Sequence, residues 1–599
     1  VGFSTICSSY PLTLSTVEIL AKLRPDLTLI LGGPQATATA VETMAAFPSV
    51  DAILGGEVEL SLPEFLAAGS VSPGEIPGLC WRDDSGDVHL NPAAPPVELE
   101  DFVSPALDLW DGPRLEPIPI EAGRGCPFRC RFCSTSGFFQ RRFRLKSPKQ
   151  LVEEVTALRK EHSFKKVEFI HDNFGANRKQ LRQFCRLWTE SKATTDLQWS
   201  CSLRPSKVDS ALARLLKESG CHSVFVGLET GSERLQKVIG KDLDVAEALE
   251  AIEELSAAGV AASVSFIVGF PEETAQDLEE TLDAYSRCME LPGVSPQMQV
   301  LSPLPGSSYH AQCREHLALD SHYSSMVHQS GGLPEENLEQ IQRYPEIHSA
   351  FYAVPTQIPR LELVLVQGFL KYGRRDFALW VRLMVHALGS LNAVVDSWSN
   401  WWRQHRNSAP GEHYFAGKEF RSDFLEWMDS SELTNRIAPE RLDGFSKLNA
   451  LFRSVRNAQE ALRGGQCSRI SVASGELTGE TVIACMGMVV PSPFHLGALL
   501  AMMQRGEDPF LAPSSVHHVV VARQPRGEWL IEQLEPLALA CLEAAGAGNS
   551  VATTLGKLVA DPRLPAIEGV SSQDVAIYSV QRLLQRQILG QKEPSTSVK

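Results

Sequence analysis

The most constraining feature of the sequence is a regular alternation of short apolar runs and amphipathic segments between residues 117 and 305. Six runs have the length and composition of buried strands, namely Pro117–Ala122, Lys166–Ile170, Gln198–Ser202, Ser223–Gly227, Ala262–Val268 and Gln297–Leu301. Between them, apolar residues recur at helical spacing over 148–161, 175–191, 208–219, 232–239, 244–258 and 274–289. Strands that alternate with helices form a parallel sheet, so this region predicts a barrel or partial barrel with functional residues at the carboxyl ends of its strands.

The rest of the chain divides around this central region. Residues 1–70 repeat the strand–helix alternation, and they begin on the strand-like run Val1–Ile6, so we expect an N-terminal piece to be missing. The expected divisions are 1–70, a linker over 71–115 with one hairpin from Gly78 to Leu90, a barrel over 116–310, a helical region over 311–465 and a C-terminal domain over 466–599. The predicted fold class is α/β, a partial (βα)6 barrel between an incomplete Rossmann-like domain and a mainly helical region.

Composition excludes several classes of protein. The 599 residues are 43% hydrophobic and 21% charged, a globular mixture. A net charge of −16 argues against a protein that binds nucleic acid or anionic membranes in general. No run approaches 18 apolar residues, so no membrane span is expected. The 13 cysteines are odd in number and mostly scattered, and no signal peptide is visible, which indicates reduced thiols and a cytoplasmic location.

Three of these cysteines cluster directly after the first barrel strand. Cys126, Cys130 and Cys133 have the spacing C-x3-C-x2-C. Three thiolates leave a four-thiolate zinc site one ligand short, but they can bind three irons of a [4Fe–4S] cluster and leave the fourth open. Arg124, Arg129 and Arg131 would offset the negative charge of such a cluster. A zinc site completed by a remote Cys or His, and three unconnected thiols, are the alternatives.

This loop resembles the cysteine motif of the radical S-adenosylmethionine (SAM) superfamily, which lies on the first strand of a partial (βα)6 barrel. The resemblance implies that Cys126, Cys130 and Cys133 are the metal ligands and the catalytic centre. It also implies that SAM chelates the open iron and is cleaved to a 5′-deoxyadenosyl radical, with an electron donor such as a flavodoxin or ferredoxin. Phe132 stands where the family packs the adenine of SAM.

The next strand ends extend the resemblance toward the methionine part of SAM. Asp172 and Asn173 stand where the family has Gly-Gly-Glu and would bind the methionine amino group, although a helix N-cap would also explain Asp172. Ser202 and Arg204 lie on one face at the end of the third strand and would meet the SAM carboxylate, Arg204 with both of its terminal nitrogens. A surface position for Arg204 is the alternative.

The fourth and fifth strands resemble the ribose and adenine sites of the family. Glu229 would accept hydrogen bonds from the ribose hydroxyls or the methionine amino group, and Gly231 would permit a close turn. Ile267 would pack against the adenine, and Gly269 would let the backbone approach it. The match therefore covers roughly residues 117–306. A plain buried strand and turn would explain either motif alone.

Residues 1–70 resemble the second half of a cobalamin-binding domain. The resemblance depends on residues that follow the three expected strands, namely Ser8, Ser9, Gly32, Gly33, Gly56 and Glu57. Ligands bind at the carboxyl ends of parallel strands, where glycines let a corrinoid approach the backbone and serine hydroxyls can bind its amides. A doubly wound domain without a ligand is the alternative. The family's frequent Asp-x-His-x-x-Gly motif, whose His can bind cobalt, is absent from this sequence.

Together the two resemblances imply a cobalamin-dependent radical SAM enzyme. Its cofactors would be a [4Fe–4S] cluster, SAM and cobalamin, and its activity methylation of an unactivated carbon or phosphorus of a natural-product or peptide substrate. The alternatives are a non-methylating member that catalyses cyclisation, ring contraction or oxidation, and a non-catalytic corrinoid-binding or redox-sensing protein. The intact cysteine triad argues against loss of catalysis, because a pure binder has no need of an open iron.

Three features outside these motifs are left open. Tyr309 lies beside the expected barrel rim and is either a substrate contact or a structural residue. The aromatic block 344–402 is either helix core or a lid over the barrel mouth. Residues 466–599 are interpreted as a capping or peptide-recognition-like domain.

Overall fold

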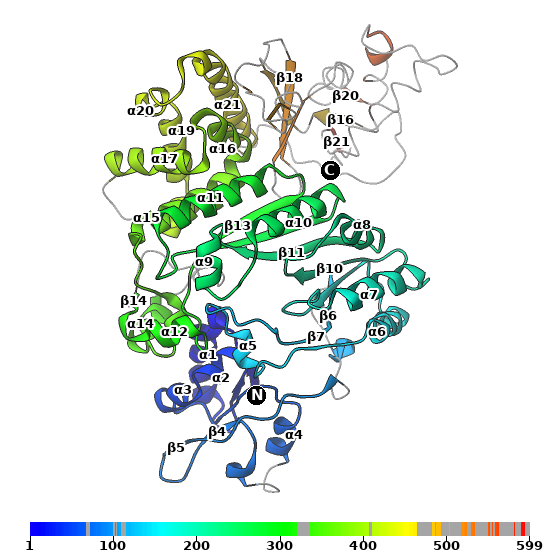
Figure 1. Cartoon of the computed structure of the whole chain (residues 1–599), viewed down its shortest axis with the longest axis vertical. Coiled ribbons are helices and arrows are strands. Elements are labelled where there is room, and N and C mark those ends of the chain that lie inside the picture. Colours follow the sequence, from blue (N-terminus) through cyan, green and yellow to red (C-terminus); the bar gives the residue numbers. More distant parts are fainter. Residues whose placement is uncertain are drawn as a thin grey trace, which may run out of the picture. The chain divides into compact units, whose positions relative to one another are not determined.

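The structure is a computed structural model of the chain (Figure 1). It describes residues 1–463 apart from 68–71, 100–101, 103–104, 110–115, 320–334 and 407–409, and beyond them 482–485, 487–492, 502–503, 509, 517–523, 529–533, 549–550, 554, 557–561, 580 and 589–592. The chain forms two compact units. The first contains Val1–Ala378 and Ser390–Phe424, and the second contains Leu379–Gly389 and Leu425–Lys599.

A six-stranded parallel sheet is the centre of the first unit. Its order is β13-β12-β11-β10-β9-β6, and all of the pairs are parallel. The strands are β6 (Ile118–Glu121), β9 (Lys166–Ile170), β10 (Gln198–Leu203), β11 (Cys221–Glu229), β12 (Ala261–Val268) and β13 (Val294–Val300). β6 and β13 form the two edges, so the sheet is open. The prediction of a partial six-stranded barrel is confirmed.

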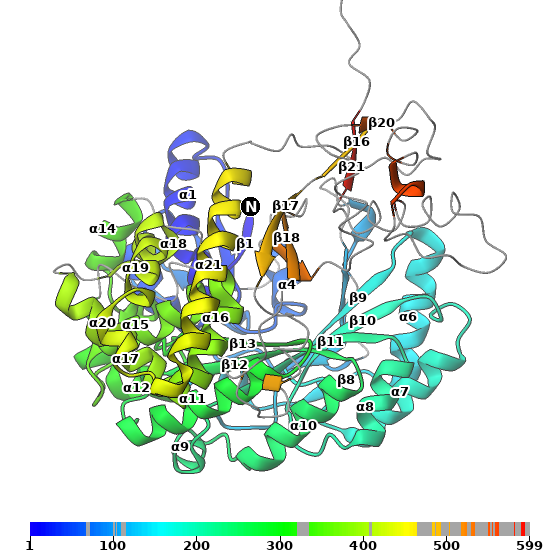
Figure 2. The ribbon, with the colours of Figure 1, turned by 90° about the horizontal axis from the view of Figure 1, so that it is seen from above.

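Helices cover the outer face of this sheet (Figure 2). They are α6 (Pro148–Glu161), α7 (Arg178–Glu190), α8 (Ser210–Glu218), α9 (Glu233–Val238), α10 (Val245–Ala257) and α11 (Ala275–Glu290). Each begins at a Ser, Thr, Asn or Asp whose side chain accepts a hydrogen bond from the first turn, namely Ser147, Asn177, Asp209, Ser232, Asp244 and Thr274. Between sheet and helices lie fully buried aromatic side chains such as Trp188, Trp199 and Phe169.

The N-terminal residues form a separate five-stranded sheet in the same unit. Its order is β1-β2-β3-β4-β5, with the first three strands parallel and the last two antiparallel. The strands are β1 (Gly2–Ser4), β2 (Ile30–Gly32), β3 (Ala52–Leu54), β4 (Leu79–Arg82) and β5 (Val88–Leu90), and the helices are α1 (Tyr10–Leu23), α2 (Pro34–Ala38), α3 (Ala40–Ala46) and α4 (Ser61–Leu66). The sequence predicted both the parallel strands and the β4–β5 hairpin.

The segments after the barrel are mainly helical. Those in the first unit are α12 (Ser308–Cys313), the strand pair β14 (Ala318–Leu319) and β15 (Tyr352–Ala353), α14 (Glu335–Arg343), α15 (Arg360–Gly368), α17 (Leu391–His405) and α18 (Glu412–Ala416). The rings of Phe369, Trp398 and Phe420 are fully buried and in mutual contact, with centroids 5.5 to 6.4 Å apart. These rings therefore pack as helix core, while a lid over the barrel mouth stays a prediction.

The second unit contains α20 (Ser431–Thr434), α21 (Leu442–Arg463) and two antiparallel sheets, while α16 (Arg374–Leu388) and α19 (Lys418–Met428) have residues in both units. The strands pair in the orders β17-β18-β19 and β20-β16-β21. They are β16 (Val482–Cys485), β17 (Gly487–Ser492), β18 (His517–Arg523), β19 (Trp529–Gln533), β20 (Asn549–Ser550) and β21 (Leu589–Lys592). The capping or peptide-recognition interpretation of 466–599 falls mostly outside the described residues.

Among the described residues, no single helix has the length and apolar character needed to cross a membrane. The helices Phe377–Leu388 and Leu391–His405 are joined at a bend, and only the two together have the length and apolar composition of a membrane span.

Candidate active site

The three clustered cysteines lie in the loop that follows β7 (Gly123–Arg124), and all three are half-buried. Burial, together with the charge of the neighbouring thiolates, raises the pKa of Cys126, and the same causes raise the pKa of Cys130 to about 11. The charge of Arg204 opposes this effect at both thiols, and that of Lys241 opposes it at Cys130. The thiols are therefore close enough to interact, and two cations lie beside them.

This donor set fits a multi-iron cluster. Among the described residues, no three His, Cys, Asp or Glu side chains are arranged to hold one metal ion. Three clustered thiols can each bind one iron of a [4Fe–4S] cube and leave the fourth iron open, whereas a structural zinc ion needs a fourth protein ligand. Cluster assembly deprotonates the thiols, and the nearby cations of Arg204 and Lys241 would stabilise the resulting negative charge.

Two glycines and a carboxylate fix the start of the cysteine loop. Gly123 and Gly125 have φ of 153° and 82°, and a Cβ at either position would collide with the backbone of the following turn, at the carbonyls of Arg144 and Arg142. The Gly125 N–H donates to Asp172 Oδ2 at 3.1 Å. Asp172 therefore anchors the cysteine loop, and the N-cap of α7 is Asn177 instead. Binding of the SAM amino group by Asp172 stays a prediction.

The end of β11 carries a buried ion pair. Glu229, at φ 70°, is 6% exposed and accepts hydrogen bonds from Lys241 Nζ at 2.7 Å and Ser265 Oγ at 3.1 Å. A Cβ on Gly227 would collide with both members of the pair, so the pair lies directly over that glycine. Lys241 Nζ also lies 5.8 Å from the centre of the Phe132 ring. Lys241 therefore joins Glu229 to the cysteine loop.

Arg204 lies beside the cysteines and not on the surface. Its guanidinium stacks on Phe128 at 3.9 Å from the ring centre, and Nη2 donates to the Lys241 carbonyl. Burial lowers the pKa of Arg204, and the two nearby thiolates oppose the shift. Ser202 is half-buried on the same side of the strand, two residues earlier. In this structure the guanidinium is held by protein groups, so a contact with the SAM carboxylate stays a prediction.

The predicted adenine contacts Phe132 and Ile267 lie together. Phe132 and Ile267 pack against one buried cluster that contains Phe270 and Tyr309. Gly269 has φ 86°, and its N–H and that of Phe270 donate to Oε2 of the fully buried Glu273. Burial raises the pKa of Glu273 to about 8, although both donors oppose the shift.

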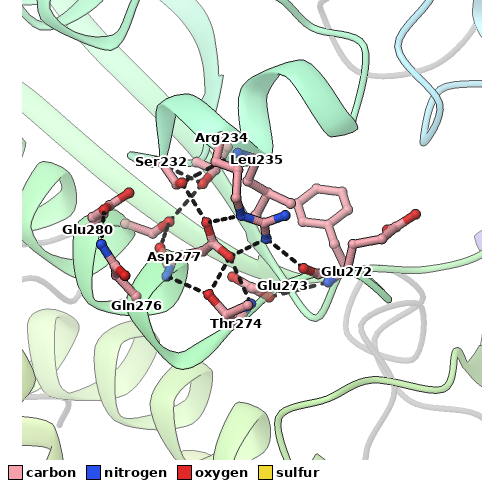
Figure 3. A network of polar contacts seen from close by, with 12 residues as sticks. Ser232, Arg234, Leu235, Glu272, Glu273, Thr274, Gln276, Asp277 and Glu280 are labelled. Carbon is pink, nitrogen blue, oxygen red and sulfur yellow. Dashed lines mark hydrogen bonds and ion pairs between the residues drawn. The ribbon is translucent and has the colours of Figure 1, made fainter.

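A polar network fixes the turns after β11 and β12 to α11 (Figure 3). Asp277 accepts hydrogen bonds from Ser232 Oγ at 2.6 Å and Thr274 Oγ1 at 2.6 Å, and it pairs with Arg234. Burial raises the pKa of Asp277, but these hydrogen bonds outweigh it and lower the pKa well below its usual range. Gly231 lies in the same turn, where a Cβ would collide with the Glu280 carbonyl. Its close approach is thus to α11, and a contact with SAM stays a prediction.

A cavity of about 540 Å³ opens where the N-terminal sheet meets the cysteine loop. One wall contains residues at the carboxyl ends of β1 to β3, including the predicted Gly32, Gly33, Gly56 and Glu57. The other wall contains Arg124, Phe138 and Phe139, which flank the cysteines in sequence. The cavity thus lies between the two regions that the sequence assigned to different cofactors.

Not every residue predicted for this site faces the cavity. Ser8 is buried and Ser9 Oγ donates to the Ile6 carbonyl at 3.4 Å, and neither belongs to the described lining. Gly33 has φ 90°, and a Cβ there would lie 2.6 Å from the Thr5 carbonyl oxygen. That glycine is therefore required by the N-terminal fold itself. Gly56 has φ 77° and faces open space.

Glu57 is engaged by an ion pair across this boundary. Its carboxylate, 4% exposed, binds Arg144 through two hydrogen bonds of 2.8 and 2.5 Å and accepts the Val97 N–H at 2.5 Å. Burial raises the pKa of Glu57, but Arg144, Val97 and the charge of Arg124 outweigh it and lower the pKa. Glu57 therefore links the N-terminal sheet to the barrel, and a corrinoid contact stays a prediction.

Sequence reasoning missed Lys241 and Arg144, the cationic partners of Glu229 and Glu57. Lys241 lies in the turn after α9, away from any strand end, and Arg144 lies in the strand β8 (Arg144–Leu145). A carboxylate that is buried requires a cationic partner. The presence of Glu229 and Glu57 at the predicted sites was therefore the only sign in the sequence that such partners exist. The sequence alone does not show which Lys or Arg supplies it.

Comparisons with known proteins identify the family of this chain. The radical SAM superfamily profile matches residues 120–285. A methyltransferase described as uncharacterised, from Pyrococcus horikoshii, is 30% identical over 318 residues, which are 51% of this chain and 67% of that protein. An anaerobic magnesium-protoporphyrin IX monomethyl ester cyclase of Rubrivivax gelatinosus is 28% identical over 44% of this chain and 50% of that protein.

A solved structure shares the fold over a larger part of the chain. The cobalamin-dependent S-adenosylmethionine radical enzyme OxsB, with aqua-cobalamin and S-adenosylmethionine bound, superposes with a TM-score of 0.52 at 17% identity. The match covers 78% of this chain and 73% of that one.

Fold and site together define an enzyme that uses SAM and a [4Fe–4S] cluster. The chain belongs to the radical SAM superfamily. It spans between half and two thirds of the length of the curated relatives named above.

Proposed function

We propose that the protein is a cobalamin-dependent radical SAM methyltransferase. The observation that carries this proposal is the shared cavity, whose walls are the strand ends of the N-terminal sheet and the segment that flanks the cysteines. A methyl-carrying cofactor and a radical-generating cofactor must both reach one substrate, and a cavity in this position allows it. The fold of OxsB and the methyltransferase relative also support the proposal.

The lining of the cavity fits a corrinoid. It is mostly apolar, with Gly32 and Gly56 leaving backbone accessible. Glu59 also lines it, and its Oε2 is buried without a hydrogen-bond partner among the described residues. This buried oxygen could accept a hydrogen bond from an amide N–H, and a corrin ring carries amide groups around its edge.

Each group of residues has a separate task in this proposal. When bound, the cluster supplies the electron that cleaves SAM, and the corrinoid supplies the methyl group. Cys126, Cys130 and Cys133 hold the cluster, and Phe132 with Ile267 orients the adenine. Glu229 binds the ribose hydroxyls or the amino group of SAM. Phe138 and Phe139 exclude water from the cavity between the two cofactors.

Cobalamin binding tests the proposed site. A Cβ on Gly32 would make only an ordinary contact of 3.5 Å with the Leu54 carbonyl, so Gly32→Leu adds bulk to the cavity without straining the backbone. We expect it to weaken binding of hydroxocobalamin at least about tenfold, or ~1.4 kcal/mol, with iron content and SAM cleavage unchanged. Gly74→Leu, outside the cavity lining, is the control. Equal cobalamin affinity in the two variants would refute the site. Gly33→Leu is unsuitable, because it would disrupt the β1–β2 contact.

Product analysis separates methyl transfer from its alternative. Transfer through cobalamin predicts S-adenosylhomocysteine together with 5′-deoxyadenosine, because one SAM methylates and another forms the radical. The cyclase of Rubrivivax gelatinosus among the relatives supports a non-methylating activity as the second candidate. Formation of 5′-deoxyadenosine and modified substrate without S-adenosylhomocysteine would favour that second candidate. An electron donor such as a flavodoxin or ferredoxin and a small-molecule or peptide substrate belong to the proposal in either case.

A further inference from the structure

Arg131, between Cys130 and Phe132, is held in place by hydrogen bonds to both its backbone and its side chain. Its backbone N–H donates to the Ile239 carbonyl at 2.8 Å, and its carbonyl accepts the Tyr309 N–H at 3.1 Å. Its Nη1 donates to the Val238 carbonyl at 3.1 Å and to Glu272 Oε1 at 3.0 Å. The backbone and the side chain of this residue are therefore both fixed.

Tyr309 and Glu272 complete the arrangement. The Tyr309 ring is fully buried under the Arg131 guanidinium, 4.4 Å from the ring centre. Its hydroxyl donates to Glu272 Oε2 at 2.9 Å, so the two oxygens of one carboxylate bind Arg131 and Tyr309 separately. We call these three side chains the clamp. They come from the cysteine loop, the turn after β12 and α12.

The clamp connects the part of the cysteine loop that contains Phe132 to the end of β12. Arg131 is the neighbour of Phe132 in the chain, and Glu272 follows the turn at Gly269 and Phe270. The rings of Phe132 and Phe270 are 6.0 Å apart, and the rings of Phe270 and Tyr309 are 5.9 Å apart. Any slippage between Arg131 and Glu272 would therefore change the distance from Phe132 to the end of β12.

We propose that Arg131, Glu272 and Tyr309 are positioning residues that hold Phe132 against the end of β12 and so set the width of the adenine site for SAM. The proposal explains why Tyr309, a rim residue, is completely buried: it acts through Arg131 and touches neither substrate nor cofactor. It depends on the cluster and SAM shared by the superfamily, and it is independent of the corrinoid proposal.

The test is SAM affinity, measured by titrating the reduced, reconstituted cluster with SAM and following its electron paramagnetic resonance signal. Tyr309→Phe removes one hydroxyl and keeps the ring, and Arg131→Gln removes the charge. We expect each to raise the Kd for SAM about fivefold, with iron content unchanged, since one hydrogen bond contributes on the order of that factor. Arg131→Lys should recover part of the affinity, because it can still reach Glu272. The double variant should have a higher Kd for SAM than either single variant. Its increase should be smaller than the product of the two single increases, because the two side chains share Glu272.

The matched control is Arg287→Gln, which breaks the exposed Arg287–Glu253 pair (2.6 Å) on the outer helices. An unchanged Kd in both clamp variants, or a change no larger than in the control, would overturn the proposal. Loss of iron in Tyr309→Phe would overturn it as well, because the clamp would then retain the cluster and not shape the adenine site. Failure of the family assignment would look different, since the unsubstituted protein would show no SAM-dependent signal. Failure of the corrinoid proposal would leave these results unchanged.

Discussion

At the scale of single residues, the chemistry of this protein depends on a few charged groups that lie beside the cysteines. Cys130 is near both Arg204 and Lys241, and Lys241 is at the same time the partner of Glu229. A cluster bound by three thiolates would be anionic, so these cations would stabilise it, while the Glu229 carboxylate keeps the Lys241 ammonium in place. Arg204 and Glu229 are also the residues that we propose for SAM binding, so the site for SAM and the site for the cluster would share these charges.

The cysteine triad gives the first prediction. Cys126→Ala, Cys130→Ala and Cys133→Ala should each abolish 5′-deoxyadenosine formation from SAM, because each removes a ligand of one iron. Cys201→Ala is the control, since that thiol is buried inside β10. Its SAM cleavage should match that of the unsubstituted protein. Quantification of 5′-deoxyadenosine under reducing conditions checks the prediction, and continued production in any triad variant would contradict it.

His348 gives a prediction about pH. Its ring is 2% exposed beside Tyr10 and Phe351, and neither ring nitrogen has a hydrogen-bond partner among the described residues. Burial lowers the pKa of His348 from 6.5 to about 3. A lowered pKa means that the unfolded chain takes up the proton first, so stability is lost as the pH falls below 6.5. At pH 5 the loss should be about 2 kcal/mol.

Denaturant unfolding at pH 7 and pH 5 measures this effect. His348→Phe removes the titrating group and keeps an aromatic ring, so its unfolding free energy should fall by less between the two pH values. His162→Phe, at the half-exposed end of α6, is the control and should behave as the unsubstituted protein does. An equal fall in His348→Phe would contradict the assignment.

At the scale of elements, one buried ion pair ties the N-terminal sheet to the barrel. Glu57 follows β3, Arg144 lies in β8, and their side chains are only 4% and 6% exposed. Glu57→Gln keeps the shape but leaves the buried guanidinium without its counter-charge, and we expect it to destabilise the protein by about 3 kcal/mol. Glu253→Gln, in an exposed pair with Arg287, should change stability by less than about 1 kcal/mol. Equal unfolding midpoints for the two variants would show that the pair does not stabilise the protein.

The elements were also the part of the structure that sequence predicted best. The barrel strands and helices follow from apolar periodicity and from capping residues such as Ser147 and Asp209, which act within a few residues of themselves. The cysteine loop was predictable because its three ligands are adjacent in the chain. Side-chain partners were not, because Glu229 and Glu57 each meet a cation from a different element, and the pairing exists only after folding.

At the scale of the whole chain, the described part of the first unit brings the strand ends of the N-terminal sheet and the segment that flanks the cysteines to one cavity, where we propose that both cofactors meet. Arg124 lines that cavity and forms ion pairs of 2.6 Å with both Glu59 and Glu121. Glu59 follows the N-terminal sheet strand β3, and Glu121 belongs to the barrel strand β6. The N-terminal sheet and the cysteine loop are thereby fixed to each other. Methyl transfer through a corrinoid needs such a fixed arrangement, because the methyl donor must meet the substrate radical where it forms.

The most direct test of this account is the magnetic interaction between the two cofactors. Protein loaded with cob(II)alamin and a reduced cluster should show an electron paramagnetic resonance signal of cobalt whose relaxation is accelerated by the nearby iron–sulfur spin. The Cys126→Ala protein, which lacks an intact cluster, should show the slower relaxation of isolated cob(II)alamin. The account predicts a clear difference between the two samples. Identical cobalt relaxation in both would contradict it, because the corrinoid would then lie away from the cysteine loop.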